Sequence, residues 1–465
     1  MSDIIASVSG IRGIIGDNLT PQNIIIFTSA FAEYCKRYFR SRSKIIVGRD
    51  GRLHGDLIAN IVISNLTLCG FEVINIGIAP TPTVQIATED LKCAGGISIT
   101  ASHNPQIWNG LKFLNPDGTF LDESQVEELL KIADENIFSY SGLEKLKTVK
   151  YDNSWLDKHI DKVLKLKVLN INKITEKKFR IVVDAVNSSG SLIVPRLLEK
   201  LGCTVIQLYC DGSGRFPHPP EPIPENLKSL ANSVKKNKAD LGISVDPDAD
   251  RLVLITEKGE PFSEENSIVT VVNFVLKKSK IKSNNVTVNL STTRAVDEVA
   301  SKYNAKVFRS PVGEINVVKE MMKRKSIVGG EGSGGVVYPE LHYGRDSIVG
   351  IALVLNEFAD YNGKISNYKN SLPQYFISKS KIDEISDPDK VLKSIEIKYS
   401  ENKNEKKIWT NDGLKIDFEN FWVHMRKSNT EPIIRIITEA KSKKEAEEHQ
   451  KMFLEMIREE SALVH

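Results

Sequence analysis

Three segments of the chain repeat one pattern, in which a short apolar run ends in a polar turn and an amphipathic stretch leads to a second apolar run. The first runs are Lys44–Asp50, Phe179–Ala185 and Asn285–Ser291, and the second runs are Phe71–Gly77, Cys203–Tyr209 and Ala305–Phe308. Apolar runs of this length indicate buried strands, and the stretches between them indicate helices. Strands that alternate with helices predict parallel or mixed sheets covered by helices.

Each segment continues into a third apolar run that opens into an unusual loop. These third runs with their loops are Gly96–Pro105, Gly242–Arg251 and Ser326–Gly335. In sheets of this kind ligands gather beyond the strand ends, at the loops. Three comparable units with three unusual loops therefore predict one shared cleft.

Changes in composition indicate four domains. We place three α/β domains at residues 1–150, 151–256 and 257–365, and a smaller C-terminal domain at 366–465. The last region contains two strand-like runs, Phe421–Met425 and Ile433–Ile437, before a final helix at about 442–460. The proline-dense segment 215–224 is expected to be an extended loop.

The composition is that of an ordinary globular protein, with 41% apolar and 26% charged residues. Lysine and arginine total 63 against 60 acidic residues, so the formal net charge is only +3. This balance argues against a general nucleic-acid or anionic-membrane surface. The five cysteines are scattered without metal-type pairing, and the chain contains no apolar run long enough to span a membrane. We therefore expect a cytoplasmic protein that binds neither nucleic acid nor membrane.

The loop after the second unit contains three alternating acids, Asp246, Asp248 and Asp250, followed by Arg251. Carboxylates this close repel one another and are usually tolerated around a hard cation. A solvated acidic turn is the simplest alternative, but such turns rarely interrupt two strand-like apolar runs. A calcium-binding EF-hand loop would need glycine where Arg251 stands and helices on both sides, although Glu257 fits its last position. We predict a divalent metal site that prefers magnesium to calcium.

Two other loops are ambiguous on their own. Ser102, at the end of a strand-like run, is compatible with an ordinary turn, and it lacks the flanking glycines of a hydrolase nucleophile elbow. The glycine-rich stretch Gly329–Gly335 is either a flexible turn or a loop whose Glu331 and Ser333 bind the hydroxyl groups of a polyol.

A fourth loop, Arg426–Pro432, is followed by Arg435 and combines cations, hydroxyl groups and a turn-forming asparagine. Backbone N–H groups, side-chain donors and a guanidinium fork together suit a phosphate. We therefore predict a phosphate-binding loop near the end of the chain.

These four motifs in this order resemble the α-D-phosphohexomutase family, which includes phosphoglucosamine mutase, phosphoglucomutase and phosphomannomutase. The likeness begins at Ser9–Gly13 and extends to the final domain, so it covers essentially the whole chain. It implies three similar α/β domains with mixed sheets and a smaller α+β C-terminal domain around a central cleft. This architecture agrees with the repeat in the sequence.

The resemblance also implies roles for individual residues. Ser102 resembles the serine that carries the phosphoryl group, and Asp246, Asp248 and Asp250 resemble the ligands of one Mg²⁺, to which phosphoserine adds an oxygen. Around them, Arg12 resembles an arginine that faces the phosphoserine, Arg251 the arginine beside the metal loop, and Lys112 a general acid/base, while His103 is either an alternative base or orients Ser102. The implied substrate-binding residues are Glu331, Ser333, His342, Arg345, Arg426, Ser428, Asn429, Thr430 and Arg435. For His342, a buried position with a hydrogen bond to a loop carbonyl is an equal alternative.

The implied reaction interconverts a hexose 6-phosphate and 1-phosphate through a sugar 1,6-bisphosphate, with a phosphosugar as partner and the chain as monomer or homodimer. The stretch Tyr338–Asp346 resembles that of phosphoglucosamine mutases, so glucosamine is the first expectation and glucose or mannose the alternative. Gly332 differs from the Met or Gln that many members have at this position. A silent sugar-phosphate-binding protein and a metal-dependent phosphatase are less favoured, because a binder does not need Ser102 with the aspartates and a phosphatase does not need the loop at 426–435.

Overall fold

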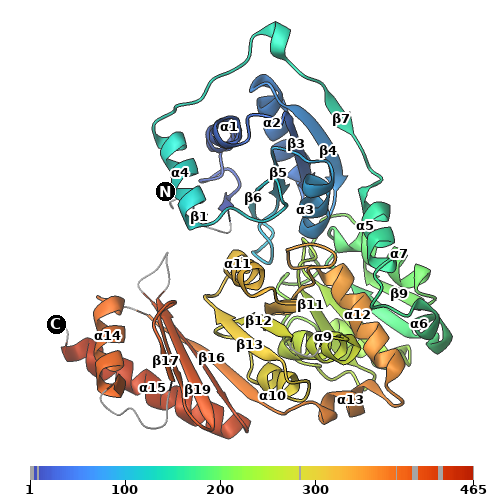
Figure 1. The fold of residues 1–465 in the computed structure, drawn as a ribbon, viewed down its shortest axis with the longest axis vertical. Coiled ribbons are helices and arrows are strands. Elements are labelled where there is room, and N and C mark those ends of the chain that lie inside the picture. Colours follow the sequence, from blue (N-terminus) through green and yellow to red (C-terminus); the bar gives the residue numbers. More distant parts are fainter. Residues whose placement is uncertain are drawn as a thin grey trace.

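A computed structural model describes residues 5–7, 10–281, 284–383, 385–400, 407–427 and 433–463. It contains four sheets. Figure 1 shows that each sheet is formed by its own part of the chain, in order from the N-terminus to the C-terminus. No helix in the described part of the chain is both long and apolar enough to cross a membrane.

The first sheet is mixed and has the strand order β1-β2-β6-β5-β3-β4-β7. Its strands are β1 (Ile5–Ser7), β2 (Gly10–Ile14), β3 (Lys44–Arg49), β4 (Glu72–Ile78), β5 (Gly95–Ile99), β6 (Trp108–Leu114) and β7 (Val149–Tyr151). The helical segments of this region are α1 (Pro21–Tyr38), α2 (Gly55–Leu68), α3 (Thr81–Asp90), α4 (Glu123–Asp134) and the short 3-10 helix η1 (Leu143–Lys145). Helices α1, α2 and α4 share one apolar core with the sheet, whereas α3 packs into a second core that continues into the next two sheets.

The second and third sheets have four strands each, in the orders β11-β10-β8-β9 and β13-β12-β14-β15. Their strands are β8 (Arg180–Asp184), β9 (Thr204–Tyr209), β10 (Leu241–Val245), β11 (Leu252–Thr256), β12 (Asn285–Asn289), β13 (Lys306–Ser310), β14 (Val328–Glu331) and β15 (Gly335–Val337). The helices around them are α5 (Trp155–Leu164), α6 (Ile171–Lys177), α7 (Gly190–Lys200), α8 (Lys228–Lys236), α9 (Glu264–Lys278), α10 (Ala295–Ser301), α11 (Glu314–Arg324), α12 (Ser347–Asp360) and α13 (Ile365–Ser371).

The repeat expected from the sequence is confirmed by strand pairing. In each of the first three sheets the first strand of the unit pairs in parallel with the second and the third strand, and an antiparallel strand returns beside the third. The unusual loops connect these last two strands: β5 to β6, β10 to β11 and β14 to β15. The proline-dense segment 215–224 contains neither helix nor strand, as expected.

Local sequence explains where the central helices begin. The Thr20 hydroxyl accepts a hydrogen bond from the Asn23 backbone at the start of α1, and Pro21 occupies its first turn. Asp346 caps α12 in the same way, because its carboxylate accepts hydrogen bonds from the backbone N–H groups of Ile348 and Val349. Helix α12 is buried along almost its whole length, so it forms the centre of the core shared by the second and third sheets.

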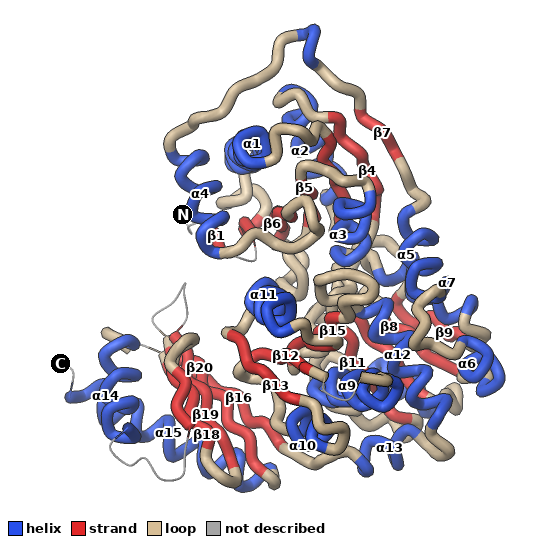
Figure 2. Tube along the Cα trace, viewed as in Figure 1, coloured by secondary structure: helices blue, strands red, loops and turns tan. Residues whose placement is uncertain are grey.

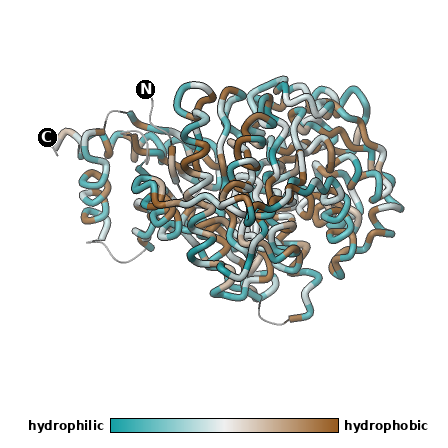
Figure 3. The backbone as a smooth tube through the Cα atoms, turned by 90° about the horizontal axis from the view of Figure 1, so that it is seen from above, coloured by the Kyte–Doolittle hydropathy of each residue, from teal (hydrophilic) through white to brown (hydrophobic). Residues whose placement is uncertain are grey.

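The C-terminal domain has a sheet and a core of its own. Its antiparallel strands have the order β16-β20-β19-β18-β17. They are β16 (Phe376–Ile382), β17 (Lys407–Trp409), β18 (Leu414–Asp417), β19 (Phe421–Lys427) and β20 (Ile434–Ala440), and α14 (Pro388–Ser400) and α15 (Lys443–Leu463) cover one face (Figure 2). The core of the C-terminal domain shares no residue with the core of the second and third sheets. Figure 3 shows hydrophobic segments throughout the rest of the molecule.

Candidate active site

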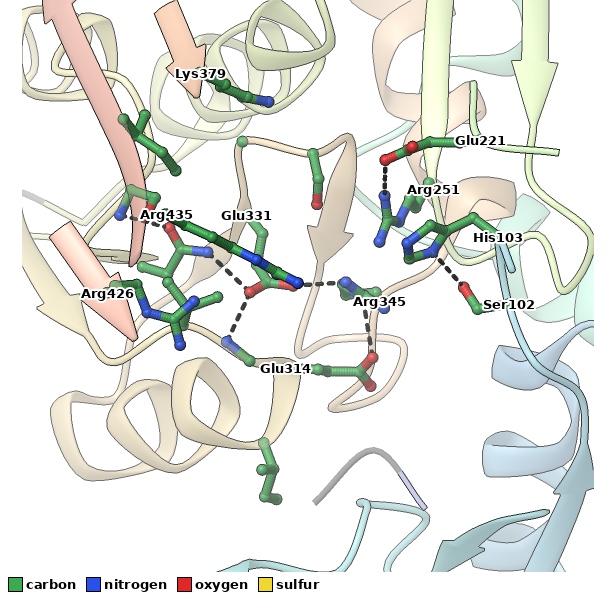
Figure 4. Close-up of a pocket in the computed structure, with 18 of the residues that line it drawn as sticks. Ser102, His103, Glu221, Arg251, Glu314, Glu331, Arg345, Lys379, Arg426 and Arg435 are labelled. Carbon is green, nitrogen blue, oxygen red and sulfur yellow. Dashed lines mark hydrogen bonds and ion pairs between the residues drawn. The ribbon is translucent and has the colours of Figure 1, made fainter. Parts of the chain in front are cut away.

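The three repeated loops and the C-terminal sheet border one cavity of about 440 Å³. Figure 4 shows Ser102 and His103 at one side of it, Glu331 and Arg345 between, and Arg426 and Arg435 at the other side. The lining residues are Arg12, Ser102, His103, Lys112, Phe120, Glu221, Arg251, Glu265, Asn289, Ser291, Val312, Gly313, Glu314, Ile315, Glu331, Gly332, Ser333, Arg345, Lys379, His424, Arg426, Arg435 and Ile437. The shared cleft expected from the repeat is therefore present, and most of the residues expected to act together line it.

Ser102 is 2% exposed and has a left-handed backbone conformation with φ +48°. A non-glycine residue with this conformation is uncommon and concentrates at functional sites. The Ser102 Oγ lies 3.0 Å from Asp246 Oδ2 and 3.2 Å from His103 Nδ1. Burial lowers the pKa of His103 to about 2, helped by the charges of Arg251 and Arg12. The imidazole is therefore neutral. Because the Ser102 hydroxyl donates its proton to Asp246 Oδ2, its oxygen can accept a hydrogen bond from His103 Nδ1.

Arg52 holds the Ser102 loop in this conformation, although nothing in the sequence singled it out. Its side chain is completely buried, and its guanidinium donates hydrogen bonds to the carbonyl oxygens of residues 102, 104, 105 and 108. Its Nε contacts Asp50 Oδ2, and that same oxygen accepts a hydrogen bond from Thr100. One planar cation therefore fixes the loop backbone through four hydrogen bonds while a fifth anchors it to Asp50, a pattern that lysine could not reproduce.

Asp246, Asp248 and Asp250 are fully buried, and their carboxylates offer ligand atoms that lie within 4.8 Å of one another. Burial and the two neighbouring carboxylates raise the pKa of Asp246 well above its ordinary value. The Oδ1 atoms of Asp248 and Asp250 are buried without a hydrogen-bond partner in the described part of the chain. Buried, unpaired carboxylate oxygens are unfavourable unless a cation binds them, so these three residues fit a hard divalent cation.

Positively charged side chains surround the aspartates. Lys112 Nζ lies 2.7 Å from Asp248 Oδ2 and 3.5 Å from Asp250 Oδ2. Burial opposes the charge on Lys112, but these two carboxylates outweigh it and raise its pKa. Arg251 is positioned beside the metal loop, 4.0 Å from Asp250 Oδ1, and Arg12 reaches the serine loop through a 3.1 Å hydrogen bond to Asn104. The structure thus brings the expected cations together on one wall of the cavity.

Arg345 connects the loop of the three aspartates to the glycine-rich loop. Its guanidinium lies 2.6 Å from Asp250, 2.6 Å from Glu331 and 3.1 Å from Glu314. Glu331 also accepts hydrogen bonds from Asn289 and from the backbone of Gly313. Burial works against the Glu331 carboxylate, but Arg345 and Asn289 outweigh it and lower its pKa. Glu331 therefore lies in the cavity as a fixed, ionised acceptor, and Ser333 of the same loop also lines the cavity.

The far end of the cavity is cationic. Arg426 and Arg435 face each other across the antiparallel pair β19 and β20. Like charges directly opposite each other destabilise a sheet, so the arrangement favours an anion between them. Asp412 holds the Arg426 guanidinium at 2.7 Å, and Lys379 and His424 line the cavity nearby. The expected partners Ser428, Asn429 and Thr430 lie outside the described residues.

His342 is not among the residues that line the cavity. It is buried, and its Nε2 lies 3.2 Å from Asp346 Oδ2, the oxygen that also contacts His159. The structure therefore places His342 in a buried polar network at the start of α12, where it positions Asp346.

Comparison with known proteins covers the chain from end to end. The four domain descriptions of the phosphoglucomutase/phosphomannomutase family match residues 4–139, 157–259, 264–376 and 379–456. A phosphoglucomutase/phosphomannomutase of Thermococcus kodakarensis is 35% identical, with 97% of each chain covered. A probable phosphoglucosamine mutase of Methanopyrus kandleri is 33% identical with the same coverage.

The fold agrees with this assignment. A crystal structure of a phosphoglucomutase/phosphomannomutase family protein from Burkholderia thailandensis superposes with a TM-score of 0.84, at 23% identity and 98% coverage of both chains. The chain belongs to the phosphoglucomutase/phosphomannomutase family of α-D-phosphohexomutases and is a phosphohexomutase.

Proposed function

We propose that this phosphohexomutase interconverts glucosamine 6-phosphate and glucosamine 1-phosphate, with Ser102 as the phosphoryl carrier. One observation carries the proposal: a buried serine hydroxyl lies 3.0 Å from an aspartate of a carboxylate trio, in a cavity whose other end holds two opposed arginines. A carrier at one end and an anion-binding pair at the other are what transfer between two positions of one phosphosugar requires.

In the first transfer, a hydroxyl oxygen of the 6-phosphosugar attacks the phosphorus on Ser102 Oγ. The bond from phosphorus to Oγ breaks, a bond to the sugar oxygen forms, and the proton of the sugar hydroxyl ends on Ser102 Oγ, so that the products are the 1,6-bisphosphate and the free serine. After the bisphosphate has turned in the cavity, Ser102 Oγ accepts its other phosphoryl group. Asp246, Asp248 and Asp250 would hold Mg²⁺, which supplies charge stabilisation for the phosphoryl group in flight.

Lys112 and His103 have different roles near Ser102. A phosphoserine of about −2 charge and three carboxylates exceed the charge of one divalent cation by roughly three units. Lys112, Arg12 and Arg251 offset that excess. The raised pKa of Lys112 keeps its ammonium group charged, so Lys112 stabilises negative charge and is not tuned to exchange a proton near neutral pH. His103, with its lowered pKa, orients the Ser102 hydroxyl instead of storing a proton. Glu331 and Ser333 bind sugar hydroxyl groups, and Arg426 and Arg435 hold the phosphate that does not react.

The preference for glucosamine is supported by the name of the Methanopyrus kandleri relative and by the resemblance of Tyr338–Asp346 to phosphoglucosamine mutases. Glucose or mannose is the second candidate, because the Thermococcus kodakarensis relative is called a phosphoglucomutase/phosphomannomutase.

The deciding experiment measures kcat/KM of the magnesium-loaded, phosphorylated enzyme for the 6-phosphates of glucosamine, glucose and mannose. We expect glucosamine 6-phosphate to give the highest value. A higher value for glucose or mannose would replace the first candidate by the second.

A further inference from the structure

Gly332 leaves a space in the sugar-binding loop that a residue from another element fills. A Cβ built on Gly332 would lie 2.1 Å from both carboxylate oxygens of Glu265. Glu265 belongs to the first turn of α9, far from the loop in sequence. Its side chain borders the cavity beside Gly332, Glu331 and Ser333, although the residue is only 9% exposed. A buried carboxylate therefore lies where a longer residue at 332 would project.

The turn that follows β12 fixes this arrangement. The Thr293 backbone N–H donates a 3.0 Å hydrogen bond to Glu265 Oε2, and the Gly332 N–H donates a 3.0 Å bond to the Thr292 hydroxyl. Two consecutive threonines thus hold both the carboxylate and the sugar-binding loop. No described residue donates a hydrogen bond to the other oxygen, Glu265 Oε1. A nearly buried acceptor without a donor at the edge of a ligand cavity is suited to a donor on the ligand.

Ionisation of Glu265 depends on a positive charge close to its carboxyl group. Burial raises its pKa to about 8; Lys379 works in the opposite direction, while Glu264 and Glu439 add to the rise. Lys379 is itself engaged by Glu264, so it does not neutralise Glu265 in a direct ion pair. A carboxyl group kept protonated by burial ionises when a second positive charge comes close, and the resulting charge-assisted bond is stronger than a bond to a neutral hydroxyl.

We propose that Glu265 selects amino sugars, its carboxylate binding the ammonium group at C2 of the hexosamine phosphate in one of the two orientations that the sugar adopts. The inference deepens the proposed function and rests on it. A glucose 2-hydroxyl at the same place forms a weaker, neutral bond, so Glu265 favours glucosamine over glucose without touching the reacting phosphorus.

The test replaces Glu265 by glutamine, which keeps the shape but not the charge. The ratio of kcat/KM for glucosamine 6-phosphate to that for glucose 6-phosphate should fall roughly 10- to 100-fold, with the glucose value nearly constant. Glu260→Gln removes the same charge from an exposed side chain of the preceding turn and should leave the ratio unchanged.

A second variant displaces the carboxylate without altering it. Gly332→Ala puts a methyl group where the Glu265 oxygens lie, and the flexible end of that side chain is what must move. The single change should lower the glucosamine-to-glucose ratio as Glu265→Gln does. In a Glu265→Ala background it should lower the ratio no further, because the two residues act through one contact.

Equal losses for both sugars in Glu265→Gln, or an unchanged ratio in both single variants, would show that Glu265 only supports the loop and would overturn the inference. Failure of the proposed function is separate: it is read from the unmodified enzyme, if that enzyme prefers glucose 6-phosphate. Thermal unfolding of each variant establishes that it is folded, and if Glu265→Gln does not fold, Gly332→Ala alone decides.

Discussion

The two ends of the cavity differ in how firmly the protein holds them. At the serine end, Ser102 is 2% exposed and the three aspartates are completely buried. The Ser102 loop extends from the first sheet, and α3 of that region packs into the core that the second and third sheets share. At the arginine end, the Arg426 side chain is 28% exposed, and it belongs to a domain with a separate core.

Contacts between the C-terminal domain and the third sheet's domain are largely polar. Arg294 donates hydrogen bonds to the carbonyl oxygens of Phe418, Glu419 and Phe421, and Ser291 pairs with His424. Polar interfaces of this kind permit domain movement more readily than apolar ones. The difference fits the reaction we propose: phosphoryl transfer needs a fixed, water-poor site, whereas the other end must release one phosphate and accept another.

The largest effect should come from removing the carrier oxygen. Ser102→Ala should lower mutase turnover by roughly 10⁴-fold or more, because no other oxygen in the described loop takes its place beside Asp246. A coupled assay for glucosamine 1-phosphate measures turnover, and thermal unfolding measures the fold. Ser301→Ala, an exposed serine on α10, is the control. Substantial turnover in Ser102→Ala would mean that Ser102 is not the phosphoryl carrier.

A smaller effect is expected at the metal loop. Asp248→Asn keeps the size of the side chain but removes a ligand charge and the partner of Lys112. The Mg²⁺ concentration for half-maximal activity should rise roughly 10- to 100-fold. Asp240→Asn, an exposed carboxyl group before β10, should leave the magnesium titration unchanged. If Asp248→Asn titrates like the unmodified enzyme, the aspartates do not act as the metal site.

The same contrast explains what could be predicted from the sequence. Each repeated loop carries its chemistry in a few consecutive residues, so the aspartates indicate a metal site by themselves, and Ser102 and the glycine-rich loop become recognisable when the four motifs are read together in order. Arg52 and Glu265 are not, because each lies in an unremarkable segment and acts on a loop distant in sequence. Glu265 can lie against position 332 only because glycine has no side chain there, and the pattern of apolar and polar residues does not reveal such a contact. His342 had two expected places, at the sugar or as a buried histidine, and the structure has it buried beside Asp346.

The smallest effect should be at the arginine end, where it separates binding from chemistry. Arg435→Ala removes one of two opposed cations and should raise KM roughly 10-fold while lowering kcat less than about threefold. Without substrate the variant should be as stable as the unmodified protein or slightly more stable, because repulsion across β19 and β20 is relieved. Arg458→Ala, an exposed arginine on α15, controls for net charge. An unaltered KM together with lower thermal stability would mean that Arg435 stabilises the sheet and does not bind the phosphate. The arginine end of the cavity would then have no separate role in holding the phosphate that does not react.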